Sequence, residues 1–207
     1  MTYIEKIAYH LGRRDEVPNQ ELAAELARER NRAGIEEIAA GLKDKNPSVQ
    51  SDCLKVLYTI GYLAPDLISG YAPTFLSLLN SKNNRMVWGA MIAIATIAEL
   101  VPDEIMPHIE RIKHLIETGT VITNVWGVKT LINLSKAGDR YYDALIGDLL
   151  DLQKQCRSVD FAKRAEDMSP VIRAAHLGEY KAILVERKPS LSGAAQKRLQ
   201  TVINRLG

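Results

Sequence analysis

The fold is decided by residues 46–61, which read NPSVQSDCLKVLYTIG. The apolar side chains of this stretch recur every three or four residues, at Val49, Cys53, Val56, Leu57 and Ile60. That spacing places them on one stripe of an amphipathic α-helix. Asn46 is a suitable N-cap for this helix, and Pro47 is a suitable first helical residue. The stretch therefore predicts a helix that starts after Asn46-Pro47 and buries one of its faces.

The same helix returns at a fixed spacing along the chain. Val49, Val87 and Val125 follow one another at intervals of 38 residues. Trp88-Gly89 is repeated as Trp126-Gly127 at the same interval. A fixed period in this range indicates stacked supersecondary units that bury one continuous core.

The segments between these helices predict a second helix in each repeat. The helix ends recur as well, because LAPD at 63–66 is echoed by LVPD at 100–103 and KAGD at 136–139 closes the third copy. Each intervening helix opens on an aspartate that can cap it and favour its positive end. These helices are expected at 66–79, 103–117 and 139–155. Pro73 and Pro107 are expected to bend the first two of them.

This helix pair resembles the HEAT and armadillo class of helical repeats. The likeness consists of a proline-containing first helix, here PTFLSLL at 73–79, together with a second helix of the kind at 46–61. It covers residues 46–138, and the chain is also similar to uncharacterised prokaryotic HEAT-like proteins, which implies a fold and no activity. HEAT second helices commonly carry an arginine where this chain has Gln50, Trp88 and Trp126. A packed aromatic ladder can replace the arginine ladder here.

The chain is therefore predicted to be all-α, a right-handed α-solenoid of about five HEAT-like helix pairs in a single domain over residues 1–207. Residues 1–45 are expected to form an N-terminal helical cap, residues 46–138 carry the clearest repeats, and residues 139–207 supply C-terminal helices. The flanking helices are expected at 3–11, 19–31, 34–42, 159–167, 178–186 and 192–205.

Composition narrows the functional classes. Apolar residues make up 46% and charged residues 25%, which is typical of a folded domain. The longest apolar stretch, Met86–Ala98, is too short to cross a bilayer. The first twelve residues contain acidic Glu5 and do not resemble a signal peptide. Cys53 and Cys156 stand far apart, which suits a reducing compartment, so we predict a cytoplasmic protein that does not contact membranes.

The charge is distributed unevenly along the chain. Residues 1–150 hold 16 Lys and Arg against 19 Asp and Glu, a net charge of −3, whereas residues 151–207 hold 11 against 6, a net charge of +5. The basic C-terminal quarter is a possible contact for nucleic acid or for an acidic protein. Solvated lysine and arginine side chains on helix faces are the commoner reason for such an excess.

The common enzyme signatures are absent from the sequence. It contains no GxGxxG, phosphate loop, GxSxG elbow, HExxH or paired CxxC. Glu104 with His108 and Glu110 with His114 are i,i+4 pairs, but an offset of six residues turns the two pairs about 120° apart on the helix. We expect surface ion pairs there rather than a metal site. We therefore predict no catalytic residue, no metal and no cofactor.

The candidate binding surface lies at the start of the second helices. Its residues are Asn84, Arg85, Trp88, Asn124, Trp126 and Lys129. In stacked helix pairs these helices line the concave side, and Trp and Arg are enriched in binding hot spots. Alternatively, both indoles pack between repeats beside Gly89 and Gly127, which permit close helix approach. We favour packing for the indoles and keep Arg85 and Lys129 as candidates for binding.

Several tyrosines, like the tryptophans, could serve either binding or packing. They either supply amphipathic contact area or lie partly buried where repeats meet, and we favour burial. The tyrosines concerned are Tyr58, Tyr62, Tyr71, Tyr141 and Tyr142.

The sequence predicts a non-catalytic helical-repeat scaffold that binds a protein or peptide partner on its concave surface. The alternative is a nucleic-acid-binding HEAT-like protein, with or without the chemistry of the HEAT-like DNA glycosylases. In that alternative Trp88, Trp126 and Asp52 would supply the aromatic residues and the carboxylate. The central repeats are not basic, however, and no spacing singles out a catalytic carboxylate. Binding to phosphates weakens steeply with salt, whereas binding through aromatic anchors does not.

Overall fold

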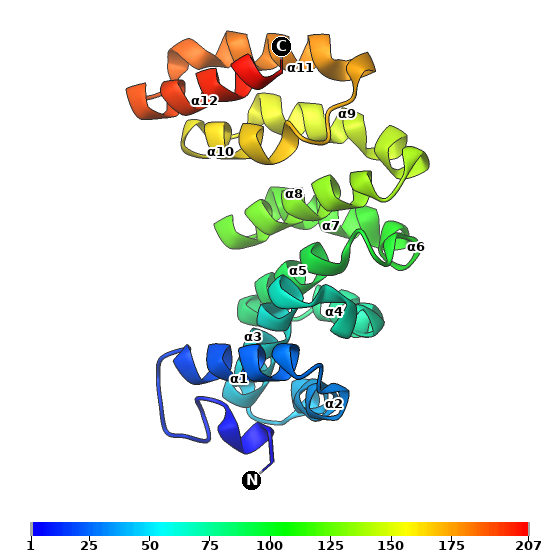
Figure 1. Cartoon of the computed structure of the whole chain (residues 1–207), viewed down its shortest axis with the longest axis vertical. Helices are drawn as coiled ribbons and strands as arrows, with labels where there is room; N and C mark the ends of the chain where they lie inside the picture. The colour runs from blue at the N-terminus through cyan, green and yellow to red at the C-terminus, as the bar shows by residue number, and fades with distance from the viewer. Residues whose placement is uncertain (1, 207) are drawn as a thin grey trace. The chain divides into compact units, whose positions relative to one another are not determined.

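The computed structural model describes residues 2–206, and over this range it contains helices and turns but no strand. The chain divides into two compact units, Met1–Asn133 and Leu134–Gly207. Figure 1 shows the helices in chain order. The prediction of an all-α protein built from consecutive helix pairs is confirmed, and the prediction of a single domain over residues 1–207 stays a prediction.

The first unit begins with a 3-10 turn and continues as helix pairs. Its elements are η1 (Ile4–Lys6), α1 (Val17–Arg28), α2 (Arg32–Ala40), η2 (Gly41–Lys43), α3 (Pro47–Leu63), η3 (Pro65–Leu67), η4 (Ser69–Tyr71), α4 (Ala72–Leu78), α5 (Asn84–Ile97), α6 (Pro102–Ile105), η5 (Met106–His108), α7 (Ile109–Thr118) and α8 (Val121–Lys136), which ends in the second unit.

The second unit is built from four further helices. They are α9 (Asp139–Gln155), α10 (Ser158–Met168), α11 (Ala174–Arg187) and α12 (Gly193–Arg205), with the short η6 (Lys188–Ser190) before the last. The flanking helices of both units were predicted to within about four residues, apart from the one at 3–11. Within the second unit, the apolar faces of α9, α10 and α11 form a core that includes the fully buried rings of Tyr142, Phe161 and Tyr180.

The helix predicted to start after Asn46-Pro47 starts there, and α5 begins with the same kind of cap. The Asn46 side chain accepts a hydrogen bond from the Ser48 amide at 2.9 Å, and Pro47 is the first residue of α3. Asn83 caps α5 in the same way through the Arg85 amide, also at 2.9 Å. These asparagines satisfy an amide that a helix start leaves without an intrahelical partner.

The first helices of the repeats differ from the prediction at 66–79. That segment forms two 3-10 turns and then α4, in which Pro73 occupies the first turn. A proline there removes an amide that has no intrahelical partner in any case, so Pro73 starts a helix instead of bending one. Pro107 does interrupt its helix, because η5 separates α6 from α7.

The aspartates expected to cap these helices do not do so. Asp66, Asp103 and Asp139 each lie within the first turn of η3, α6 and α9, and none of these elements has a side-chain cap hydrogen bond. Their negative charge still lies near the positive helix end, which is the favourable position for it. Of the two roles predicted for these residues, the electrostatic one is retained at Asp103 and Asp139, which begin α-helices.

The helix expected at 3–11 is wrong, because only Ile4–Lys6 forms a 3-10 turn. The amides that follow are taken by side chains of other helices. Asn19 accepts from the Ala8 amide at 2.9 Å, and Asp52 accepts from the Tyr9 amide at 2.7 Å. A short helix is costly to nucleate. These long-range hydrogen bonds therefore fix the N-terminal segment against α1 and α3 without a helix.

Three glycines allow the helices of the first unit to approach closely. A Cβ atom on Gly89 would lie 2.6 Å from Cδ2 of Leu54, and one on Gly127 would lie 2.4 Å from Cγ1 of Ile116. Both distances are shorter than real carbon–carbon contacts, so the prediction that these glycines permit close helix approach is confirmed. Gly61 has the same role on α3, facing α5.

Gly61→Ala is expected to destabilise the protein. The added Cβ would lie 2.2 Å from the Thr96 hydroxyl oxygen, which is itself held by a 2.7 Å hydrogen bond to the Ala93 carbonyl. Overpacking of this kind costs about 1–3 kcal/mol and outweighs the gain in helix propensity, which is about 0.5–1 kcal/mol. Urea denaturation followed by circular dichroism measures the change.

Gly147→Ala is the matched control for Gly61→Ala. Gly147 lies inside α9, and a Cβ atom there would meet nothing within 4 Å. Only the propensity term remains, so this variant should be about 0.5–1 kcal/mol more stable than the wild type. Equal shifts in both variants would show that the contact with Thr96 does not restrict residue 61.

Candidate functional site

Four aromatic rings from three helices of the first unit form a continuous row. Tyr58 and Tyr62 lie one turn apart on α3, with ring centroids 6.0 Å apart. Trp88 of α5 contacts Tyr58 at 6.2 Å, and Trp126 of α8 contacts Tyr62 at 5.6 Å. The rings are tilted or edge-on, as aromatic pairs prefer. We call Trp88, Tyr58, Tyr62 and Trp126 the aromatic row.

The aromatic row lies half inside the protein. Tyr58 is buried, Tyr62 is 49% exposed, and both indoles are half-buried. The two interpretations of the tryptophans therefore describe different parts of the same side chains. One part of each indole packs against a tyrosine of α3, and another part stays accessible. The ladder expected between repeats runs through these tyrosines.

A lysine lies against each tyrosine–tryptophan pair of the row. The ammonium of Lys129 is 4.1 Å from the centroid of the Trp126 ring, and that of Lys55 is 4.9 Å from the Tyr58 ring. Such cation–π contacts contribute about 0.5–2 kcal/mol, with the larger values at desolvated sites. Lys55 also forms an ion pair with Glu16 at 2.7 Å.

Burial sets the protonation of the row. It raises the pKa of Tyr62 to about 12. It also raises the pKa of Tyr58, although the Lys55 ammonium acts in the opposite direction. Burial acts to lower the pKa of Lys55. The hydrogen bonds to Glu16 and Tyr58 together raise this pKa by more than burial lowers it, so the net shift is upward. The tyrosines are thus neutral and Lys55 is charged over the physiological range.

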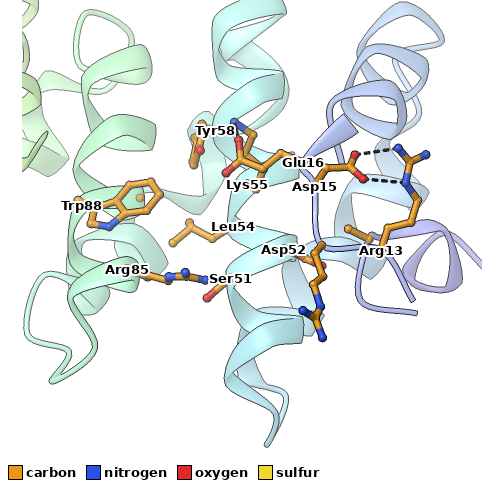
Figure 2. A pocket seen from close by; sticks show the side chains of 13 residues that line it. Arg13, Asp15, Glu16, Ser51, Asp52, Leu54, Lys55, Tyr58, Arg85 and Trp88 are labelled. Atoms are coloured by element: carbon orange, nitrogen blue, oxygen red, sulfur yellow. Dashed lines mark hydrogen bonds and ion pairs between the residues drawn. The ribbon is translucent and has the colours of Figure 1, made fainter. Parts of the chain in front are cut away.

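Beside Trp88 the row opens into a cleft of about 230 Å³ between the N-terminal segment, α3 and α5. Figure 2 shows Arg85 extending from α5 toward Ser51 of α3, below the indole of Trp88. Four cationic and three anionic side chains line the cleft. They are Arg13, Arg14, Lys55 and Arg85, and Asp15, Glu16 and Asp52.

The three carboxylates of the cleft are all engaged. Asp15 accepts two hydrogen bonds of 2.9 Å from the Arg13 guanidinium, which lower its pKa. Glu16 pairs with Lys55, and Asp52 accepts the Tyr9 amide. Two cations of the cleft are thereby neutralised. Its other two cations, Arg14 and Arg85, are exposed.

The residues predicted for binding separate into four groups. Trp88, Trp126 and Lys129 belong to the aromatic row or contact it, and Arg85 lines the cleft. Asn84 is exposed at the first position of α5, outside both features. Asn124 instead ties two helices together, since its amide donates to the Ile116 carbonyl at 2.7 Å.

Sequence reasoning missed Lys55 and the segment 13–16 as parts of this surface. Lys55, Tyr58 and Tyr62 follow one another at intervals of three and four residues, so a reading of that face of α3 could have grouped them. The segment 13–16 carries no such signal. It reaches the cleft because Asn19 and Asp52 hold the preceding amides.

The remaining candidates lie elsewhere. Tyr71 is half-buried and contacts Phe75, whereas Tyr141 and Tyr142 are buried in the second unit. Glu110 pairs with Lys113 at 3.2 Å.

Over residues 2–206, no three His, Cys, Asp or Glu side chains gather closely enough to hold a metal ion. No helix in that range is long and apolar enough to span a membrane.

Many cations of the C-terminal region are used inside the second unit. Arg164 donates to the Leu152 carbonyl at 2.7 Å and Arg187 to the Cys156 carbonyl at 3.0 Å, so both guanidinium groups satisfy carbonyls near the end of α9. Arg198 forms a bidentate ion pair with Glu166. These contacts give the basic excess a structural role and leave fewer cations for phosphate groups.

The helix pairs define the class: the chain is an all-α helical-repeat protein with the fold of armadillo and HEAT-like solenoids. No protein-family model and no curated protein matches its sequence. Among solved structures it is similar to a designed armadillo repeat protein in complex with the peptide (KR)4, with a TM-score of 0.65 and 13% identity, covering 99% of this chain and 98% of that one.

Two further structures agree with this class. One is an engineered protein of a structural genomics consortium, with a TM-score of 0.62 and 18% identity over 100% of this chain and 99% of the other. The second is a computationally designed armadillo repeat protein for modular peptide recognition, with a TM-score of 0.60 and 14% identity over 98% and 97%. At these identities the likeness establishes the fold.

Trp88→Ala is expected to lower the free energy of unfolding by about 1–3 kcal/mol. A fully buried tryptophan would cost about 3–5 kcal/mol, and this indole is half-buried against Tyr58. Arg85→Ala, on the exposed side of the same helix, should change stability by less than about 0.5 kcal/mol. Chemical denaturation compares them, and equal stability of both variants would mean that the indole does not pack.

Stability should fall as pH rises above about 10, because Tyr62 ionises near pH 10 in the unfolded chain and near pH 12 in the folded protein. The unfolded chain then holds fewer protons, which favours unfolding between these values. Tyr62→Phe should show a smaller loss of melting temperature over this window. An unchanged pH profile in Tyr62→Phe would contradict the raised pKa of this phenol.

Proposed function

We propose that this protein is a non-catalytic helical-repeat scaffold that binds an extended segment of a protein or peptide along the aromatic row. The observation that carries the proposal is the half-exposed row itself, with Arg85 beside one indole and Lys129 over the other. Tryptophan, tyrosine and arginine dominate binding hot spots. Rings that are already packed on one side lose little conformational entropy when a partner covers the other side.

The length of the row suits a short extended segment. Its three steps between ring centroids are each about 6 Å, so its ends lie at most about 18 Å apart. An extended chain spans about 3.3 Å per residue, so about five or six residues would cover the row. The names of the similar designed proteins, which mention a peptide complex and peptide recognition, support a partner of this kind.

The nucleic-acid alternative has weaker support. Aromatic rings can stack on bases, and cations can contact phosphates. Several cations of the basic C-terminal region are, however, engaged within the second unit. Asp52, the carboxylate considered for glycosylase chemistry, accepts a backbone amide at 2.7 Å. We therefore place nucleic-acid binding, with or without base chemistry, second.

The proposal is tested by selecting peptides of about eight residues from a random display library against the immobilised protein. Selected peptides should bind Arg85→Ala and Lys129→Ala more weakly, by about fivefold each. Arg85→Ala should melt at the wild-type temperature because its side chain is exposed, and Lys129→Ala should lose at most the cation–π contribution of about 0.5–2 kcal/mol and stay folded. Lys197→Ala removes an exposed lysine of α12 and serves as the control that should bind normally.

The double variant Trp88→Phe, Trp126→Phe tests the indoles directly. The aromatic row is excluded as the binding site if this double variant, Arg85→Ala and Lys129→Ala all bind the selected peptides as tightly as the wild type does. In that case the selected peptides bind elsewhere on the protein. Failure to select any peptide would remove the proposed function.

A further inference from the structure

We infer that the segment bound by the aromatic row is acidic: an extended polypeptide whose carboxylates contact Arg14, Arg85 and Lys129 and whose apolar side chain lies against the accessible parts of the half-buried indoles. This inference rests on the proposed function and specifies the chemistry of the partner. It is carried by the balance of paired and unpaired charges around the row.

The cleft beside Trp88 presents cations, since its anions are already used. Asp15 is held by Arg13, Glu16 by Lys55 and Asp52 by the Tyr9 amide. Arg14 and Arg85 line the same cleft and have no ion-pair partner among residues 2–206. A guanidinium group offers a planar pair of donors that matches a carboxylate.

The other end of the row is cationic as well. The Lys129 ammonium lies 4.1 Å from the centroid of Trp126, so a cation is in contact with the ring at this end of the row. Lys129 is half-buried, so its charge is less screened by water than that of a fully exposed lysine. An anionic group of the partner would meet a positioned cation there too.

This positive surface is not a consequence of overall composition. Residues 1–150, which contain the whole row and cleft, carry a net charge of −3. Arg14 and Arg85 are nevertheless left without an ion pair among the described residues beside the row, while Asp15 and Glu16 are paired with cations and Asp52 keeps its charge on a backbone amide. The cleft therefore keeps an excess of positive charge. Complementary charge directs specificity and association rate, and like charges disfavour the wrong partner.

The similar designed protein in complex with (KR)4 therefore differs from this chain in the expected partner charge. A basic peptide along this row would place its cations against Arg14, Arg85 and Lys129. A nucleic acid would satisfy these cations, but its continuous phosphate backbone would also pass the carboxylates of the cleft, Asp15 and Glu16 among them. Separate cations at the two ends of a short row suit separate carboxylates better than a phosphate backbone.

The test compares four labelled probes by fluorescence anisotropy. Three are peptides of equal length: an acidic peptide with a central leucine, a neutral peptide with the same leucine, and (KR)4. The fourth is oligo-dT. We expect the acidic peptide to bind about tenfold or more tightly than the neutral one and (KR)4 not to bind. Added salt should weaken the acidic complex and leave the residual affinity of the aromatic contact.

Charge reversal provides the decisive variant. Arg85→Glu should weaken binding of the acidic peptide by about tenfold or more and should improve binding of (KR)4. Lys197→Glu changes the net charge by the same amount on α12 and should alter neither. Unchanged melting temperatures verify that the variants fold, and Arg14→Glu repeats the test from the other side of the cleft.

Each remaining outcome is informative. Equal or tighter binding of the neutral peptide or of (KR)4 overturns the acidic-partner inference and leaves peptide binding intact. Tighter binding of oligo-dT than of the acidic peptide overturns it in favour of nucleic acid. Absence of binding by all four probes overturns the inference, and the library selection described above then decides separately whether the proposed function survives.

Discussion

The close approach of α3 and α5 is the constraint on which the rest of this surface depends. It exists because Gly61 leaves room for the Thr96 hydroxyl and Gly89 leaves room for the Leu54 side chain. Wider spacing would lose dispersion contacts along both helices. With the helices this close, Tyr58 reaches Trp88 across the junction. The absence of two side chains therefore creates the first aromatic contact of the row.

The same geometry extends to the third repeat. Thr130 and Asn133 of α8 reach Met91 and Ala95 of α5, which fixes the register of the two helices. In that register Trp126 contacts Tyr62 of α3, a helix that is not its immediate partner. The tryptophans at equivalent positions of two repeats, Trp88 and Trp126, thus connect α5 and α8 to α3. The aromatic row is continuous because both of them contact tyrosines of α3.

In the proposed function, stability and recognition share the same side chains. The indoles contribute packing with one part and remain accessible with another, so a partner would meet rings whose conformation is already fixed. Among the surrounding charges, some stabilise the fold and others remain unpaired within the described part of the chain. Lys55 and Glu16 stabilise each other near Tyr58, while Arg14 and Arg85 add positive charge to the cleft without an ion pair of their own. A scaffold of this kind needs no moving part to present a binding surface.

The sequence by itself determined the helical class, the repeat of the second helices, the Asn46 cap and the close approach at Gly89 and Gly127, because periodicity and capping are local properties. The sequence also singled out Trp88, Trp126 and Lys129, which the structure places in the aromatic row or against it, and their role in binding stays a proposal. Only the tertiary structure decided that Asn124 turns inward, that segment 66–79 splits before Pro73, and that residues 13–16 line the cleft. The placement of residues 13–16 depends on partners far away in sequence, such as Asp52 for the Tyr9 amide and Glu16 for Lys55. Which charges neutralise each other, and which remain for a partner, follows from long-range packing that no local pattern encodes.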